Sequence, residues 1–229
     1  MKKIVLLALA ALISVPMFAQ EEEWDGLVYA SPNNVVRFEL LSSFGYGYHF
    51  VSSPDFRSRM SDEFFLNIAQ FGLYPIDALG IELGLDVAFS DFASNSHAFY
   101  LNGERKIQAV EFSELVPGTL DRHIGSADIF SINAPLVLKL RAGDFWIGGG
   151  AIGSLNLMGR TDYAYRQDNR RVEVSERRAQ VNLFTYGLVA TLGYDSFGVY
   201  FKYFPKTSRL LPEGSMELSY STLGFVFDF

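Results

Sequence analysis

The sequence of 229 residues predicts an all-β protein whose strands close into an antiparallel, eight-stranded transmembrane β-barrel. Three observations support this fold class. Apolar residues make up 49% of the chain, and they occur in short segments that alternate apolar and polar positions. Tight turns and long polar connections separate these segments in turn, and the chain begins with a segment typical of export. The predicted barrel therefore has short periplasmic turns and long extracellular loops.

The first 19 residues have the pattern of a cleaved signal peptide. Lys2 and Lys3 are basic, Ile4–Ile13 is apolar, and Ala19 is a small residue at a plausible cleavage site. The apolar run is too short for a spanning helix, which needs about 20 residues. The expected organisation is a signal peptide over 1–19, a periplasmic N-terminal segment over 20–34 and an outer-membrane β-barrel domain over 35–229.

The composition narrows the classes of function. The chain has no cysteine, so it carries no disulfide and no cysteine-based metal site. Its formal charge is −7, and loss of Lys2 and Lys3 with the signal peptide lowers this to −9. That charge argues against a nucleic-acid partner, which would require a basic face.

Eight segments have the alternation of strands. They are Val35–Phe50, Glu63–Tyr74, Leu79–Asp91, Asp128–Arg141, Phe145–Met158, Gln180–Tyr194, Phe197–Phe204 and Leu218–Phe229. The first strand has its apolar residues and Ser42 at even positions, with Leu41 on the opposite face. The second alternates weakly, so its faces are not assigned, and the third alternates most clearly.

The fourth strand contains Pro135, which removes one hydrogen-bond donor from the ladder. A bulge or local bend is therefore expected at this position. The fifth strand is rich in glycine, and the sixth, seventh and eighth strands each carry large apolar residues on one face. Tight turns follow the second, fourth and sixth strands, at 75–77, 142–144 and 195–196.

An even number of strands places both ends of the barrel on the periplasmic side. The eighth strand must then pair with the first, because an unpaired backbone in hydrocarbon costs several kcal/mol per group. This pairing is expected to set Phe229 near Val35–Arg37, with Asp228 within reach of Arg37.

The alternative is a soluble barrel, similar to a lipocalin, with its apolar face inside. Aromatic residues cluster near the strand ends on the apolar face, as in the girdles of membrane barrels. The polar face is rich in Gly, Ala and Ser, and its few charges lie on the non-lipid side of their strands. We expect these charges to form an interior cluster toward the periplasmic half: Arg37, Glu39, Glu82, Asp86, Lys139, Arg141, Lys202 and Asp228.

The sequence resembles the PorT-like outer-membrane β-barrel family, whose members are small eight-stranded barrels similar in plan to OmpA and OmpX. The matching segments are Phe18–Gln20, Ile132–Lys139 with its central proline, Phe197–Tyr203 and Gly224–Phe229. The resemblance covers essentially the whole mature chain. It implies that Phe229 is a signal for the barrel-assembly machinery, and it implies no catalytic residues.

Two segments resemble functional motifs but lack the context that such sites require. The segment Gly148–Gly153 fits G-x-G-x-x-G, but a dinucleotide site would need a helix to begin there. His49 lies on the same face as Ser43, and some eight-stranded barrels modify lipid A with His and Ser at the outer rim. No further base or orienting group accompanies this pair, so no catalytic, metal or cofactor site is predicted.

The connection Gly159–Arg178 is predicted to be an exposed loop of mixed charge. Its arginines could contact lipopolysaccharide, because guanidinium pairs with phosphate through two hydrogen bonds: Arg160, Arg166, Arg170, Arg171, Arg177 and Arg178. The expected function is a non-enzymatic structural or surface-interaction role with an unknown extracellular ligand. A lipid A acyltransferase or deacylase and a narrow pore are the alternatives.

Overall fold

A computed structural model describes residues 36–53, 61–76, 78–115, 122–167 and 170–229. The predicted signal peptide and N-terminal segment lie outside the described residues. Within these ranges, no helix has the length and apolarity needed to cross a membrane.

The described chain is almost entirely β-structure. Its elements are β1 (Val36–Ser52), β2 (Asp62–Ile76), β3 (Leu79–Ser94), β4 (His97–Leu101), β5 (Ile107–Glu111), α2 (Phe112–Leu115), β6 (Arg122–Ala142), β7 (Phe145–Gln167), β8 (Arg170–Ala179), β9 (Phe184–Tyr194), β10 (Phe197–Tyr203) and β11 (Ser219–Asp228).

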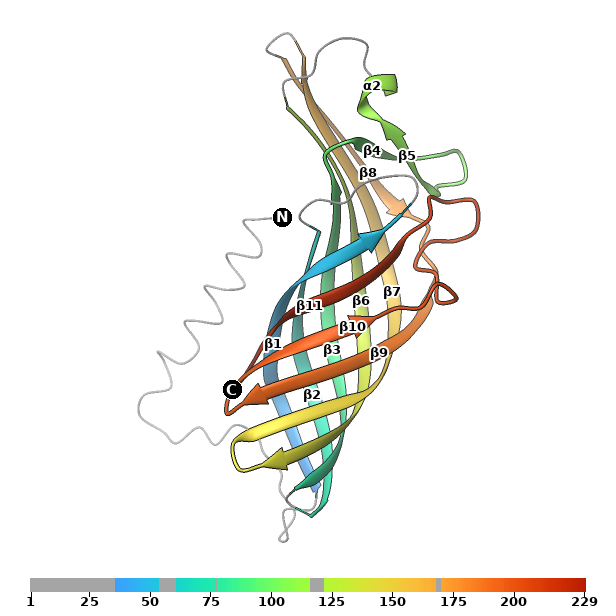
Figure 1. Cartoon of the computed structure of the whole chain (residues 1–229). Helices are drawn as coiled ribbons and strands as arrows, with labels where there is room; N and C mark the ends of the chain where they lie inside the picture. The colour runs from blue at the N-terminus through green and yellow to red at the C-terminus, as the bar shows by residue number, and fades with distance from the viewer. Residues whose placement is uncertain (1–35, 54–60, 77, 116–121, 168–169) are drawn as a thin grey trace.

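Eight of these strands form a closed ring. The order around it is β1-β2-β3-β6-β7-β9-β10-β11, and β11 pairs back to β1, each pair being antiparallel (Figure 1). Two-residue turns join β6 to β7 and β9 to β10, at the end of the ring opposite to the long connections. The predicted fold class, a closed eight-stranded barrel with short periplasmic turns and long extracellular loops, is confirmed.

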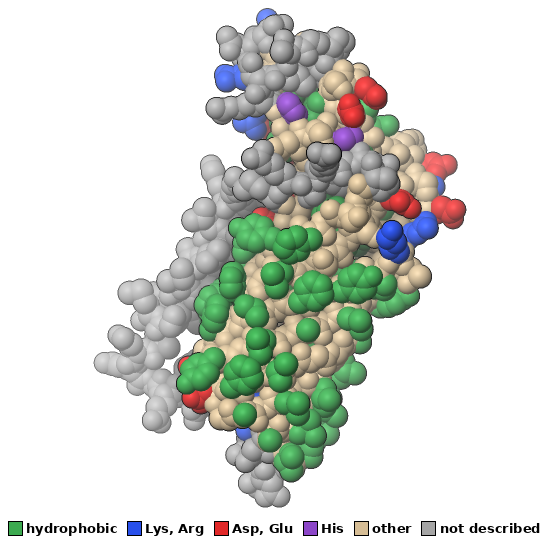
Figure 2. Space-filling view, viewed as in Figure 1, with side chains coloured by type: hydrophobic (Ala, Val, Ile, Leu, Met, Phe, Trp, Pro, Cys, Tyr) green, Lys and Arg blue, Asp and Glu red, His purple; other side chains and the backbone are tan. Residues whose placement is uncertain are grey.

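The ring has its apolar side chains outside. On β3, Leu83 and Phe89 are 47% and 45% exposed, whereas Glu82 and Asp86 are 8% and 4% exposed. Figure 2 shows apolar side chains spread over the barrel, while many of the acidic and basic side chains gather at its upper end. Such an outer band requires lipid around it, since water would leave a large apolar surface exposed.

Strand β1 departs from the predicted alternation at one point. Leu41 has a φ of 51° and is exposed, and Ser42 is buried, so these two residues exchange the predicted faces. The register with β2 shifts between Leu40 and Ser43, which marks a β-bulge. The alternation above and below the bulge follows the prediction.

The bulge expected at Pro135 is not there. Leu136 pairs with Leu83 and Asn133 pairs with Asp86, so the register with β3 is the same on both sides of the proline. The irregularity in the β6–β7 pairing falls instead between Phe130 and Ser131. The β3–β6 pairing is interrupted at Gly84–Pro135 and Leu85–Ala134 without a change of register, and a Cβ on Gly84 would lie 3.0 Å from the Pro135 ring.

The seam between β1 and β11 is staggered further than predicted. Asp228 pairs with Ser43, and the N–H of Phe229 donates to the carbonyl of Ser42. The pairing of first and last strands is therefore correct, but the predicted position of Phe229 beside Val35–Arg37 is wrong. Strand tilt in a closed barrel requires such a stagger, and strand lengths alone do not reveal it.

Large aromatic side chains fill the barrel interior. Phe65, Trp146, Tyr200 and Val226 pack together and are each at most 8% exposed. Glycines on neighbouring strands make room for these rings: a Cβ on Gly193 would lie 2.2 Å from the Trp146 indole. An interior filled in this way is typical of eight-stranded barrels and gives no support to the narrow-pore alternative.

Beyond the barrel, the chain forms a folded extracellular head. Strands β6 and β7 continue past the ring and, with β8, form a three-stranded sheet on which β4 and β5 pack (Figure 1). A hydrophobic core holds the head together, with these buried members: Phe92, Phe99, Ile107, Ala127, Ile129, Ala179, Leu210, Leu211 and Met216. The predicted loop Gly159–Arg178 is thus mainly a β-hairpin, because its two sides pair directly.

Candidate functional site

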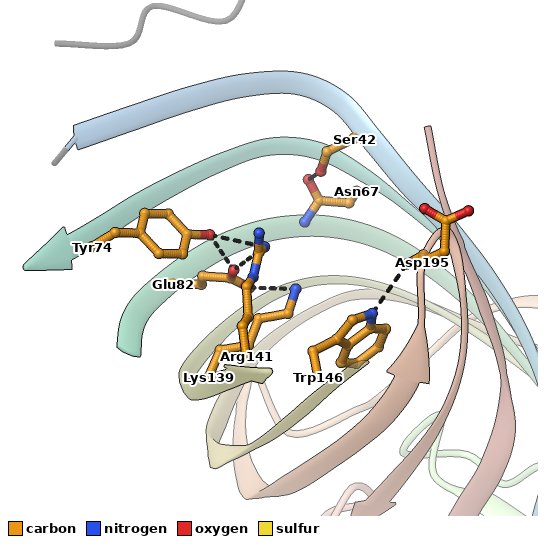
Figure 3. A network of polar contacts seen from close by, with 8 residues as sticks. All are labelled: Ser42, Asn67, Tyr74, Glu82, Lys139, Arg141, Trp146 and Asp195. Carbon is orange, nitrogen blue, oxygen red and sulfur yellow. Dashed lines mark hydrogen bonds and ion pairs between the residues drawn. The ribbon is translucent and has the colours of Figure 1, made fainter. Parts of the chain in front are cut away.

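The first candidate is the polar network inside the lower barrel (Figure 3). Lys139 Nζ and Arg141 Nη2 each lie 3.3 Å from a carboxylate oxygen of Glu82. The hydroxyl of Tyr74 donates to the same carboxylate, and Arg141 also donates to Tyr74 at 3.3 Å. Lys139 lies 4.5 Å above the Trp146 ring. Each buried ion thus has a partner, which is the condition for a stable buried pair.

A second buried pair lies nearer the extracellular end. Lys202 Nζ is 2.5 Å from Glu63 Oε1, and both side chains are at most 5% exposed. Tyr200 donates to Glu63 at 3.3 Å, and Lys202 also lies 4.3 Å above the Phe65 ring. The predicted partners of Lys202 were Glu39, Glu82, Asp86 and Asp228. Asp86 lies close enough to Lys202 to attract it, but the ion pair is with Glu63, so that part of the assignment is corrected. Glu63 was missed because the faces of its strand were not assigned.

Asp86 has an amide partner rather than a basic one. Asn67 Nδ2 donates to Asp86 at 2.7 Å, and Ser42 donates to Asn67 at 2.9 Å. These three hydrogen-bonded side chains lie in the interior between the two ion-paired groups. The expected single cluster is therefore divided into separate networks at different heights.

The remaining predicted charges line a cavity at the periplasmic mouth. Its volume is about 280 Å³, and Arg37, Glu39 and Asp228 lie in its wall with Lys139 and Arg141. Arg37 stacks 4.7 Å above the Tyr74 ring. The expected contact between Arg37 and Asp228 is replaced by this stacking, because the stagger of the seam sets Asp228 opposite Ser43.

His49 lies inside the barrel rather than at its lipid-facing rim. It is 6% exposed, Nδ1 lies 2.8 Å from the Thr222 hydroxyl, and the ring stacks on Phe92 at 4.7 Å. Ser43 is six residues below His49 on the same strand, a distance of about 20 Å along an extended chain. The two side chains therefore do not form a pair that could act on one substrate.

The other sequence motifs have structural explanations. Gly148–Gly153 lies within β7, so no helix begins at the glycines. In the part of the chain that the structure describes, no three His, Asp or Glu side chains are arranged to hold a metal ion.

The outer face of the head sheet carries four of the six arginines singled out in the sequence. Arg160 pairs with Arg177, and Arg166 pairs with Arg171, on two rungs of the neighbouring strands β7 and β8 that lie six residues apart. The parity of the strand continues the lipid-facing side of the barrel, since Met158, 63% exposed, lies just below Arg160. We call the Arg160–Arg177 rung the base row and the Arg166–Arg171 rung the upper row.

The acidic partners of these arginines are few. Arg160 is 2.7 Å from Asp162 and also lies opposite Asp128 of β6, whose carboxylate attracts it. Arg171 is 2.9 Å from Glu173. Arg166 and Arg177 have no ion pair with any described residue. Arg170 is exposed near the tip of the hairpin, and the backbone carbonyl of Arg178 accepts a hydrogen bond from Arg105.

The upper row borders a cavity in the head. Its volume is about 660 Å³, and it is lined by Asn95, His123, Ile124, Ala164, Tyr165, Arg166 and Arg171. Sequence reasoning singled out the arginines but missed the cavity, since His123 and Asn95 come from a different connection. The alternation of Val172 and Val174 with charged residues was a signal of the hairpin.

Comparison with solved structures finds neighbours of low sequence identity. The structure is similar to Ail, the attachment invasion locus protein of Yersinia pestis, with a TM-score of 0.36 and 13% identity over 82% of this chain and 95% of that chain. It is also similar to the outer membrane protease OmpT of Escherichia coli, with a TM-score of 0.42 and 13% identity over 86% of this chain and 80% of that chain. No family model and no curated protein sequence matches the chain.

Fold and site together define a class of protein. The chain is a transmembrane β-barrel with a filled interior and a folded head whose outer face is rich in arginine.

Proposed function

We propose that this protein is a non-enzymatic component of the outer membrane whose head binds lipopolysaccharide. The observation that carries the proposal is the base row of arginines, which lies directly above the lipid-facing band. Phe130 pairs with exposed Met158, and the next outward rung contains Arg160 and Arg177. Arginine at the upper edge of a lipid band is well placed to meet the phosphates of lipid A.

The fold of the barrel supports a location in the outer membrane. A closed antiparallel barrel with an apolar outer face is the β-structure that can span a bilayer. The export pattern of residues 1–19 supports delivery across the inner membrane before assembly.

Assembly itself would use the end of the last strand. Phe229 is 71% exposed and its ring lies 5.7 Å from that of Phe44. We propose that this aromatic terminus is available to the barrel-assembly machinery and then joins the periplasmic girdle.

The lipid A-modifying alternative has weaker support. His49 and Ser43 both point into a packed interior, whereas an enzyme acting on lipid needs its reacting groups at the lipid surface. Mass spectrometry of lipid A from cells with and without the gene tests the point. Identical lipid A masses are expected, and a mass difference would support the enzyme instead.

Binding is tested with the mature chain reconstituted in phospholipid nanodiscs. The probe is fluorescent lipopolysaccharide, and the double variant carries both Arg160→Gln and Arg177→Gln. We expect the wild-type chain to bind and the double variant to bind about tenfold less tightly, with a weaker dependence on salt. Arg209→Gln removes an exposed arginine from another connection and is the matched control. Equal binding by the double variant and the wild type would overturn the proposal.

A further inference from the structure

We infer that the cavity beside the upper row is a binding site for a phosphorylated sugar of the lipopolysaccharide core. This inference rests on the proposed function and extends it, because it assigns a second site and a different part of the ligand. The residues that carry it are Arg166, Arg171, His123, Tyr165 and Asn95, which all line the cavity.

The upper row brings two positive charges together. Arg166 and Arg171 are directly opposite each other on neighbouring strands. Like charges at directly opposite positions destabilise a sheet. Glu173 offsets only Arg171, at an exposed pair, and Arg166 has no carboxylate partner among the described residues. A bound anion between the guanidinium groups would remove this repulsion.

The side chains that line the cavity suit a phosphorylated sugar. Two guanidinium groups recognise phosphate through paired, charge-assisted hydrogen bonds. Ile124 offers apolar surface to a sugar ring on the same face as Arg166, and the amide of Asn95 can bond its hydroxyls. Tyr165 and His123 line the cavity from the other face of the sheet, since they pair with each other at positions that alternate with Arg166. Anion contacts and sugar contacts thus occur in one place.

The size of the cavity and its distance from the lipid also fit a core sugar. The cavity of about 660 Å³ is far larger than a phosphate ion needs and lies within the range of small-molecule sites. The upper row is six residues beyond the base row along β7, about 20 Å along the strand. With a strand tilt near 40°, this is about 15 Å further from the lipid. That level corresponds to core sugars rather than to lipid A.

The test uses the full mature chain in nanodiscs and calorimetric titration. The probes are delipidated core oligosaccharide, the same oligosaccharide after removal of its phosphates, and inorganic phosphate. We expect the phosphorylated oligosaccharide to bind, and removal of its phosphates to weaken binding about tenfold or more. Arg166→Gln and Arg171→Gln should each cause a similar loss. Arg166→Lys should also weaken binding, because it keeps the charge but loses the paired geometry. Arg209→Gln should have no effect.

Each outcome of these titrations supports or overturns a stated part of the inference. Equal binding of the phosphorylated and dephosphorylated oligosaccharides, or unchanged binding by both Arg→Gln variants, would overturn the inference. Inorganic phosphate binding as tightly as the oligosaccharide would overturn its sugar component. If whole lipopolysaccharide binds and responds to Arg160→Gln with Arg177→Gln while the core oligosaccharide does not bind, this inference fails and the proposed function stands. Heat-modifiable electrophoretic mobility confirms that each variant is folded.

Discussion

At the scale of single residues, buried ions in the barrel are paired across strands that are distant in the sequence. Glu63 and Lys202 are 139 positions apart, and both are almost completely buried. The sequence could place Lys202 on the inner face by parity, but it could not place Glu63. The reason is physical: a register shift between Asn67 and Ala69 interrupts the alternation of β2.

This pair makes a prediction for stability. Lys202→Met leaves the Glu63 carboxylate buried without its ion partner, and we expect a loss of about 3–5 kcal/mol of unfolding free energy. Adding Glu63→Gln to Lys202→Met should recover much of that loss, because no buried charge then remains at the pair. Urea unfolding in a lipid bilayer measures the free energy of unfolding of the single and the double variant. A Lys202→Met chain as stable as the wild type would contradict the pairing.

The packing of Trp146 gives a second prediction. A Cβ on Gly193 would lie 2.2 Å from the indole, so Gly193→Ala must displace the ring, at a cost of about 1–3 kcal/mol. Gly149→Ala is the matched control, because the nearest atom to its new Cβ lies 3.9 Å away. Trp emission and the unfolding midpoint report the change. Equal effects of the two substitutions would show that the indole does not lie against Gly193.

At the scale of elements, the alternation in the sequence predicted all eight strands of the ring. It failed where two backbone positions changed faces, at Leu41 and Ser42, and where a charged segment formed a hairpin. The amino-acid composition alone could not predict either feature. A bulge depends on one backbone angle, and the β7–β8 hairpin depends on contacts with β6 and with the head core.

The lipid-facing assignment of β3 makes a prediction at this scale. Leu83 is exposed on the outer face, and an arginine there near the bilayer midplane would cost about 2–4 kcal/mol. In Gly84→Ala the new Cβ points inward and lies 2.9 Å from Asn67 Nδ2 and 3.0 Å from the Pro135 ring, a crowding that the amide can partly relieve by shifting. Refolding into bilayers should therefore be impaired more by Leu83→Arg than by Gly84→Ala. The assignment fails if both variants refold equally well.

At the scale of the whole molecule, the fold depends on closure of the barrel. The even number of strands and the length of the connections were sufficient to predict that the first and last strands pair. They could not give the register, because the stagger of a closed barrel is a property of the complete ring. The site on the head was beyond prediction for a similar reason, since its residues come from separate connections that meet only in the folded structure.

Disulfide cross-linking in a chain that has no natural cysteine tests closure most directly. The variant Ser43→Cys with Asp228→Cys places two thiols at paired positions of β1 and β11. The control, Ser131→Cys with Asn156→Cys, places them on the paired neighbours β6 and β7. We expect both pairs to cross-link, and Arg37→Cys with Asp228→Cys not to do so. If the control cross-links and the Ser43–Asp228 pair does not, the ring is open at this seam and the eight-stranded barrel is wrong.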